Sequence, residues 1–231
     1  MWLVYLVQGG GNWDPHRRAV WQQRFAARLL KVMRFSVDAH GQPEEGSFIA
    51  ANHQGYMDIL VMASLTPQVF LSRKDVGDWP FIGRFVKMAG TLFIDRSRRS
   101  EVSNQEDGFS RAIACKVGMT VYLEGTSTDG SEILPFKSSL LQPVVKNQWK
   151  VTPAYIRYEC DGGDPAMDVC WWGDMTFGSH LLKLLNLKSI QATIVFGPAR
   201  SPGKDRKALA KELHADVLEL GDQLSSSLET Q

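Results

Sequence analysis

Apolar runs of strand length alternate with segments of helical periodicity along most of the chain. Six runs have the length and composition of strands, and in the last of them apolar and polar residues alternate: 47–51, 69–71, 90–94, 121–123, 151–155 and 189–196. Helical patterns occupy residues 81–88, 106–117 and 175–185, and a last helix follows Asp205 as its N-cap. That helix has one apolar face, formed by Leu209, Leu213, Val217, Leu220 and Leu224. The alternation predicts a protein of the α/β class.

The first helical segment is amphipathic and strongly basic. Asp14 can cap it and Pro15 can open it, and we expect it to cover residues 15–35. Its apolar stripe consists of Trp21, Phe25, Leu29, Val32 and Met33. No acid occurs between Pro15 and Phe35, whereas six residues there are basic: Arg17, Arg18, Arg24, Arg28, Lys31 and Arg34. This pattern is typical of a helix that lies on a membrane surface, with the arginines among anionic head groups. The alternative is a core-packing helix with a solvated basic face.

The composition indicates a single domain with an ample core. The 231 residues are 44% hydrophobic and include seven tryptophans, and α/β domains of this length are common. We expect a short apolar stub over residues 1–14, the basic helix over 15–35, one folded domain over 36–224 and a frayed tail over 225–231. Residues 159–168 are rich in Asp and Gly and predict a surface loop.

Charge, cysteine and histidine content argue against several classes of protein. The net charge is only +1, so we expect no nucleic-acid partner. The cysteines have neither metal-ligand spacing nor an even number, which indicates reduced thiols in a cytosolic setting: Cys115, Cys160 and Cys170. Four histidines also lack ligand spacing, so no metal is expected: His16, His40, His180 and His214.

No segment reaches the ~18 apolar residues needed to cross a bilayer. The apolar start, Met1–Val7, is short and lacks the basic residues of a signal peptide. It is either the stub of a longer anchor or an artefact of the start site.

The pair His53 and Asp58 suggests a general base with its partner. His53 follows the apolar run 47–51, and an apolar helical pattern begins at Ile59. Residues five apart do not share one face of a regular helix. They can meet only if His53 lies in the loop before the helix and its ring folds over the first turn, with Gly55 at the bend. Asp58 would then fix the tautomer and stabilise the imidazolium. The alternative is a histidine that makes only a structural hydrogen bond.

Three later strands also carry residues suited to a site. Asp95 and Arg96 follow the run 90–94, Glu124 follows the run 121–123, and Pro153 lies within the run 151–155. Open α/β sheets gather their ligand-binding groups at the carboxyl ends of strands. Each feature has an alternative interpretation when taken singly. Asp95 and Arg96 suit a surface ion pair, Glu124 with Gly125 suits a turn, and Pro153 suits an edge strand.

In this order the residues resemble the four motif blocks of the glycerolipid acyltransferase family, typified by 1-acylglycerol-3-phosphate acyltransferases, over residues 20–200. The resemblance implies a single domain with a mixed sheet covered by helices, and places the acyltransferase domain at 36–224. It implies that His53 is the base and Asp58 its partner, and that Arg96 contacts phosphate. The acceptor site would be shaped by Glu124, Gly125 and Thr126, and Pro153 would represent the fourth block. Smaller matches at 72–74, 79–83 and 134–137 add Lys74 and Lys137 as weaker contacts for the acceptor head group.

The third block departs from the family pattern at two positions. Leu123 stands where the family usually has proline, and Ser127 where it usually has arginine. Loss of the arginine removes a bidentate phosphate clamp that serine cannot reproduce. Together with the Trp-Trp-Gly-Asp-Met sequence at 171–175, the variant resembles a subgroup that acts on lyso-lipids without a phosphate head, such as lyso-ornithine lipid.

The resemblance implies an enzyme of phospholipid biosynthesis that needs no cofactor beyond its acyl donor, carried on coenzyme A or acyl carrier protein. The expected acceptor is a 1-acylglycerol-3-phosphate-like lyso-lipid, and a lyso-ornithine lipid is the alternative. Two rivals stay open: a transacylase or hydrolase that uses the same base, and a silent membrane-binding relative. The lack of a Gly-x-Ser-x-Gly motif counts against an ordinary serine hydrolase. We expect a peripheral location on the cytoplasmic face of a membrane, such as a bacterial inner membrane.

Overall fold

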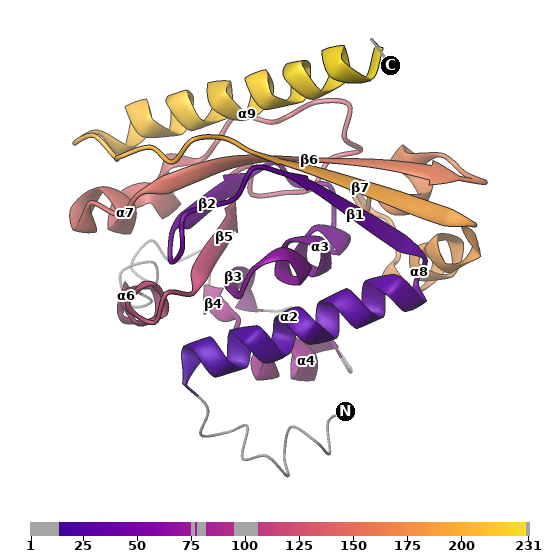
Figure 1. Ribbon diagram of the computed structural model, residues 1–231, viewed down its shortest axis with the longest axis horizontal. Coiled ribbons are helices and arrows are strands. Elements are labelled where there is room, and N and C mark those ends of the chain that lie inside the picture. Colours follow the sequence, from indigo (N-terminus) through magenta and orange to yellow (C-terminus); the bar gives the residue numbers. More distant parts are fainter. Residues whose placement is uncertain (1–13, 75–76, 78–81, 95–105, 230–231) are drawn as a thin grey trace.

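The computed structural model describes residues 14–74, 77, 82–94 and 106–229. Within these residues seven strands form one sheet in the order β1-β7-β6-β2-β5-β3-β4 (Figure 1). The strands are β1 (Phe35–His40), β2 (Phe48–Ala51), β3 (Gln68–Arg73), β4 (Leu92–Ile94), β5 (Gly118–Tyr122), β6 (Val151–Asp161) and β7 (Ser189–Phe196). Neighbouring strands are parallel except for β6 and β7, which are antiparallel. The predicted α/β fold with a mixed sheet is therefore confirmed.

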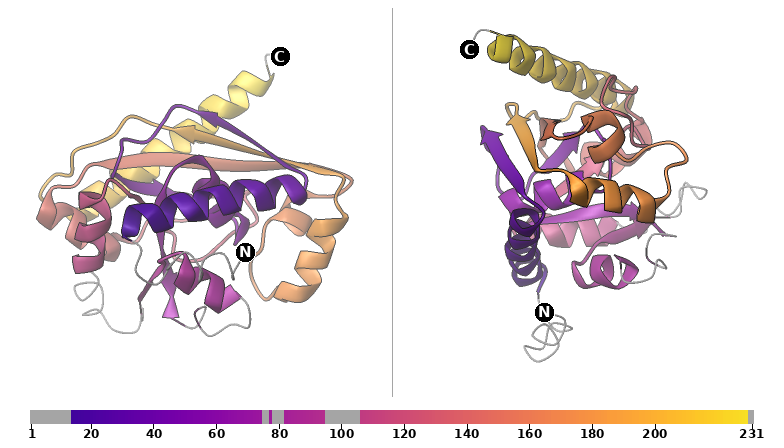
Figure 2. Two further views of the ribbon diagram at one scale, coloured as in Figure 1. Left: turned by 60° about the horizontal axis from the view of Figure 1, so that its bottom comes forward. Right: turned by 90° about the vertical axis from the view of Figure 1, so that its right-hand side faces the viewer.

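Helices cover both faces of this sheet (Figures 1 and 2). One face packs against α2 (Pro15–Val32), α3 (Met57–Leu65) and α8 (Phe177–Asn186), and the other against α6 (Glu106–Ala114), α7 (Gln142–Asn147) and α9 (Arg206–Glu229). A short helix α4 (Ile82–Met88) connects β3 to β4, and two helical turns, η3 (Ser138–Leu141) and η4 (Pro165–Val169), complete the described elements. Because both faces are covered, the central strands β2 and β5 are buried along their whole length.

Helix α2 begins as predicted but ends earlier. The Asp14 side chain accepts a hydrogen bond from the Arg17 backbone N–H at 2.9 Å, which caps the first turn. The helix stops at Val32, and Arg34 has a positive φ of 62°. Phe35 then starts the edge strand β1, which the sequence pattern did not predict. The reason is local: the left-handed residue breaks the helix, and the Arg34 carbonyl accepts from the Ile190 N–H at 3.1 Å, which starts the pairing of β1 with β7.

Other boundaries differ because tertiary pairing extends or shortens elements. Strand β6 continues to Asp161 because its second half pairs with β7. The predicted loop 159–168 is therefore wrong for residues 159–161, which belong to β6. The last residues of the predicted loop form η4. Helix α6 ends at Ala114 instead of 117. Residues 225–229, predicted to form a frayed tail, are helical and belong to α9. The described residues include no helix long and apolar enough to cross a membrane.

Helix α9 packs its predicted apolar face on the sheet. The five residues of that face are all buried: Leu209, Leu213, Val217, Leu220 and Leu224. Asp205 accepts from the Lys207 N–H at 2.7 Å as the predicted cap. Arg200 follows β7 and links it to α9. Its guanidinium donates hydrogen bonds to both carboxylate oxygens of Asp216, at 3.0 and 2.7 Å.

We expect Leu213→Ala to lower the free energy of unfolding by about 2–5 kcal/mol, because the fully buried side chain would leave a cavity. Leu218→Ala is the matched control on the same helix, since Leu218 is 41% exposed and should change stability by about 0.5 kcal/mol or less. Urea denaturation of the two variants measures the difference. Equal effects would contradict the packing of α9 on the sheet.

Candidate active site

His53 lies in the loop between β2 and α3, at the carboxyl end of a central strand. Strands β5 and β6 flank β2 and run parallel to it, so their carboxyl ends meet beside this loop. The loop is fixed to β6 by Asn52, whose side chain accepts from the Ile156 N–H at 2.7 Å and donates to the Ile156 carbonyl at 2.9 Å. The predicted arrangement of strand, histidine loop and helix is confirmed.

The Asp58 carboxylate accepts four hydrogen bonds inside the protein. Its Oδ2 lies 2.7 Å from His53 Nδ1 and accepts from the backbone N–H groups of Gln54 and Gly55, at 2.7 and 3.0 Å. Its Oδ1 accepts from the Tyr158 hydroxyl at 2.7 Å. Asp58 is fully buried, and a buried carboxylate needs such donors. Because a carboxylate only accepts, His53 carries its proton on Nδ1, and Nε2 presents a lone pair.

The His53 ring is held in place on a second side by Tyr122. The two rings stack with centroids 4.1 Å apart and an angle of 13° between their planes. Among the described residues no hydrogen bond reaches Nε2, and the His53 side chain is 21% exposed whereas that of Asp58 is inaccessible. Burial, and secondarily the Asp58 charge, raise the pKa of the Tyr122 phenol well above its usual value, so the stacking partner is neutral. The accessible part of the imidazole is therefore available for proton transfer to a substrate.

Glu124 supports the histidine loop from the end of β5. One carboxylate oxygen accepts from the His53 backbone N–H at 2.7 Å and the other from the Leu134 N–H at 2.8 Å. Glu124 is buried, and burial raises the pKa of its carboxyl while these two backbone donors oppose the shift. Its observed contacts position the base, since both oxygens are occupied by the protein backbone.

The turn after Glu124 contains the predicted residues Gly125 and Thr126, and Lys137 lies against it. Gly125 has a φ of +77°, and a Cβ built there would lie 2.6 Å from Lys137 Nζ, so the lysine side chain crosses the glycine. Thr126 is exposed. The Thr128 N–H donates to the His53 carbonyl at 3.0 Å, which ties this turn to the base loop.

The remaining predicted residues lie elsewhere. Lys74 is exposed just after β3. Arg96 lies outside the described residues, as does the stub over 1–13. Pro153 lies in β6 between β2 and β7, so its interpretation as an edge-strand marker is wrong.

Sequence reasoning missed three residues that shape the site: Tyr122, Tyr158 and Trp171. Their contacts depend on which strands and loops adjoin, and no short motif contains them with His53. The run at 171–175 was informative only as a family variant. In the structure the Trp171 N–H donates to the Gln54 carbonyl at 2.7 Å, directly beside His53.

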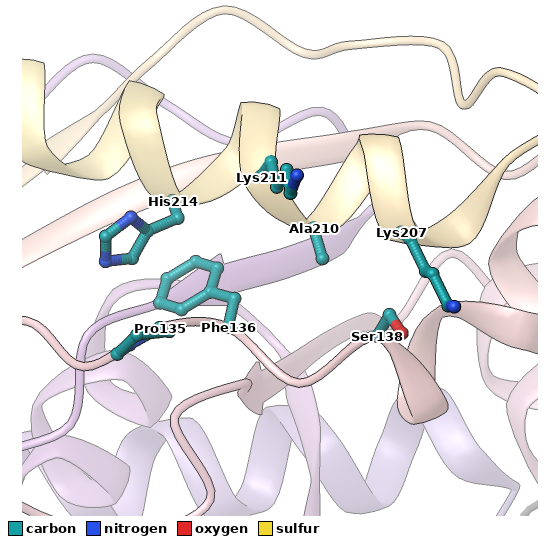
Figure 3. A pocket seen from close by; sticks show the side chains of 7 residues that line it. All are labelled: Pro135, Phe136, Ser138, Lys207, Ala210, Lys211 and His214. Atoms are coloured by element: carbon teal, nitrogen blue, oxygen red, sulfur yellow. The ribbon is translucent and has the colours of Figure 1, made fainter.

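A separate pocket of about 310 Å³ lies between α9 and the segment that follows Leu134 (Figure 3). It is lined by Pro135, Phe136, Ser138, Lys207, Ala210, Lys211 and His214. Neither His53 nor Asp58 contributes to it. No group of three or more His, Cys, Asp or Glu side chains able to hold a metal ion occurs in the part of the chain that the structure describes.

A buried aspartate and an oriented histidine thus lie at the carboxyl end of a central parallel strand of an α/β fold, an arrangement suited to a general base. The model of the Acyltransferase family matches residues 26–157, more than half of the chain. The chain belongs to this glycerolipid acyltransferase family and is an acyltransferase.

Individual relatives are similar over most of the chain. A lyso-ornithine lipid O-acyltransferase of Rhodobacter capsulatus is 33% identical over 192 residues, covering 80% of this chain and 69% of that protein. The enzyme of the same name from Pseudomonas aeruginosa is 32% identical and covers 83% and 74%. A 1-acyl-sn-glycerol-3-phosphate acyltransferase of Neisseria gonorrhoeae is 24% identical and covers 74% and 68%. The crystal structure of the 1-acyl-sn-glycerophosphate (LPA) acyltransferase of Thermotoga maritima has a TM-score of 0.66 at 17% identity, covering 90% of this chain and 79% of that one, and shows the same fold.

We expect His53→Ala to reduce acyl transfer by about 10²–10⁴-fold with the fold intact, as for loss of a general base. Asp58→Asn should be severely impaired because the amide cannot hold the ring as the carboxylate does. His40→Ala is a matched control: His40 Nε2 lies 3.3 Å from Asp38, but both side chains are more than half exposed on β1. Initial rates of thioester consumption measure the effect. Near-normal turnover by folded His53→Ala protein would exclude His53 as the base.

Proposed function

We propose that this acyltransferase moves a fatty acyl chain from a thioester, on coenzyme A or acyl carrier protein, to the hydroxyl of a lyso-lipid, with His53 as general base. The observation that carries the proposal is the His53–Asp58 pair. Nδ1 is held at 2.7 Å from a buried carboxylate, and no hydrogen bond from the described residues reaches Nε2.

In the proposed reaction His53 Nε2 removes the proton from the acceptor hydroxyl as its oxygen attacks the thioester carbonyl. A carbon–oxygen bond forms, the carbon–sulfur bond breaks, and the imidazolium returns the proton to the leaving thiolate. Asp58 stabilises the imidazolium while it exists, since the carboxylate is fixed next to Nδ1. No covalent intermediate with the enzyme is needed.

For the acceptor we propose a lyso-ornithine lipid, with 1-acylglycerol-3-phosphate as second candidate. Two observations support this order. Relatives named for the ornithine lipid are more similar to this chain than those named for the glycerophosphate. In addition, Ser127 occupies the position of the family arginine, and its hydroxyl donates to the Trp171 carbonyl at 2.6 Å. Ornithine lipid lacks a phosphate, so its recognition needs no such arginine.

Purified protein and a labelled acyl thioester, on either carrier, should acylate lyso-ornithine lipid with a kcat/KM at least about tenfold above that for 1-acylglycerol-3-phosphate. This is the size expected from one missing charge-assisted hydrogen bond to phosphate. Product formation with each acceptor, and free fatty acid without one, are measured in parallel. Preference for the phosphate acceptor would favour the second candidate. Fatty acid release at an equal rate without acceptor would favour the hydrolase.

We also propose a peripheral position on the cytoplasmic face of a membrane, with α2 at the lipid surface. The buried face of α2 consists of Ala19, Gln22, Ala26 and Leu30. The predicted stripe is different: Trp21 and Phe25 are half-buried and stack on each other at 5.9 Å, and Val32 is 79% exposed. Core packing therefore involves mainly the face of Ala19, Gln22, Ala26 and Leu30, together with Met33 at the end of the predicted stripe.

Helix α8 adjoins the end of α2 and extends the proposed lipid-facing surface (Figure 1). Arg34 Nη2 donates to the Leu185 carbonyl at 2.8 Å, which joins the two elements. Leu182 and Leu185 are 67% and 42% exposed. Lys183 is exposed next to Leu182, and Lys31 is exposed next to Val32 on α2. Exposed apolar groups among cations suit an anionic lipid surface.

We expect the double change Val32→Ser and Leu182→Ser to weaken binding to anionic vesicles several-fold, with activity on detergent-dispersed substrate and melting temperature nearly unchanged. Binding of the unaltered protein should fall with added salt, because the cations act within about one Debye length of the surface. Leu218→Ser, on α9 across the sheet, is the control. Vesicle co-sedimentation measures binding, and unchanged affinity of the double variant would exclude this surface.

A further inference from the structure

The segment that links η4 to α8 is bound on both sides to the loops of the active site. The Trp171 N–H donates to the Gln54 carbonyl at 2.7 Å. The Trp171 carbonyl accepts from the Ser127 hydroxyl at 2.6 Å. Trp171 therefore bridges the histidine loop and the turn that follows Glu124.

Gly55 allows the tryptophan to approach the histidine loop closely. Its φ is +153°, and a Cβ at this position would lie 2.9 Å from the Trp171 backbone nitrogen and 3.1 Å from its Cβ. Any larger residue would push the tryptophan away. The close approach of the Trp171 segment to the histidine loop therefore requires glycine at position 55.

The side chain of Trp171 belongs to a group of aromatic residues. Its indole N–H donates to the Met175 carbonyl at 2.9 Å, which closes the turn 171–175. Its ring lies 6.0 Å from that of Tyr56 at an angle of 63°. Tyr56 also contacts Phe177, with ring centroids 5.1 Å apart, and its hydroxyl lies 2.9 Å from His180 Nδ1. Burial lowers the pKa of His180, so this group carries no positive charge near neutral pH.

The charged side chains of the two turns that adjoin Trp171 are acidic. Asp174 is exposed at the turn that Trp171 closes. Asp129 lies in the turn that contains Ser127, and the Ser131 hydroxyl and N–H hydrogen-bond to it and lower its pKa. Two carboxylates repel a phosphate dianion and attract an ammonium, and the faces of aromatic rings also favour a cation.

We propose that Ser127 and Trp171 form the wall of the acceptor site that selects a head group with an ammonium and without a phosphomonoester. The inference rests on the proposed acyl transfer to lyso-lipids and identifies the residues that decide between its two acceptors. Ser127 acts by holding Trp171 in place and by adding no cation at the position of the family arginine. Trp171 supplies the aromatic surface, and Asp174 and Asp129 supply the negative potential.

The test compares Ser127→Arg, Trp171→Leu and the control Ser201→Arg. The last variant adds the same charge at an exposed residue next to Arg200, which pairs with the first residue of β6, and it touches neither Trp171 nor the acids of the wall. For each protein, kcat and KM are measured with lyso-ornithine lipid and with 1-acylglycerol-3-phosphate, on one acyl donor, after the melting temperature has been recorded.

We expect the ratio of kcat/KM for the ornithine acceptor to that for the phosphate acceptor to fall at least about tenfold in Ser127→Arg and in Trp171→Leu. The change should lie in the KM of the acceptor, with the KM of the donor unchanged, and Ser201→Arg should keep the original ratio. Trp171→Leu decides the matter if Ser127→Arg does not fold.

An unchanged ratio in folded Trp171→Leu, or an equal shift in Ser201→Arg, would overturn the proposed wall while leaving acyl transfer intact. Failure of the unaltered protein to acylate either acceptor would instead contradict the proposed function. The two failures are thus distinguishable.

Discussion

The geometry of the candidate active site depends on the hydrogen bonds that the buried Asp58 carboxylate accepts. This carboxylate is fully buried and accepts from His53, from two backbone N–H groups and from Tyr158. An unpaired buried carboxylate would be very costly, so these donors must assemble whenever the protein folds. The same four bonds join the first turn of α3, the histidine loop and β6. The orientation of the His53 ring is consequently a product of the fold itself, and it exists before any substrate binds.

A second buried carboxylate holds the loop from the opposite strand. Glu124 accepts from the His53 and Leu134 N–H groups, and burial raises its pKa. The two acids have different roles, because Asp58 contacts the imidazole whereas Glu124 contacts only backbone. Their positions follow from the sheet, because β5 and β6 both pair in parallel with β2, and Ala51 is in register with both Tyr122 and Ala154. Central parallel strands thus bring distant segments of sequence to one loop.

The sequence predicted what depends on local pattern and motif. The buried strands, the capped starts of α2 and α9, and the His53–Asp58 pair in its loop all have signals within a few residues. Edge strand β1 and the long second half of β6 do not, because they exist through pairing with β7. The stacking of His53 on Tyr122 and the bond from Tyr158 to Asp58 likewise depend on strand register. The core face of α2 uses small residues such as Ala19 and Ala26, so a stripe of large apolar residues was a poor guide to it.

The peptide units around Gln54 contact both the carboxylate that orients His53 and the Trp171 segment. The N–H groups of Gln54 and Gly55 face Asp58, while the Gln54 carbonyl accepts from the Trp171 N–H. The N–H groups of this short stretch of backbone therefore support the Asp58–His53 pair, and its carbonyl group binds the Trp171 segment. Both contacts use main-chain atoms of the loop, so the side chain at position 171 can change while the hydrogen bonds that orient His53 persist. With the roles proposed for His53 and Trp171, the acceptor preference can change without altering the base, and Gly55 is the residue that constrains both contacts.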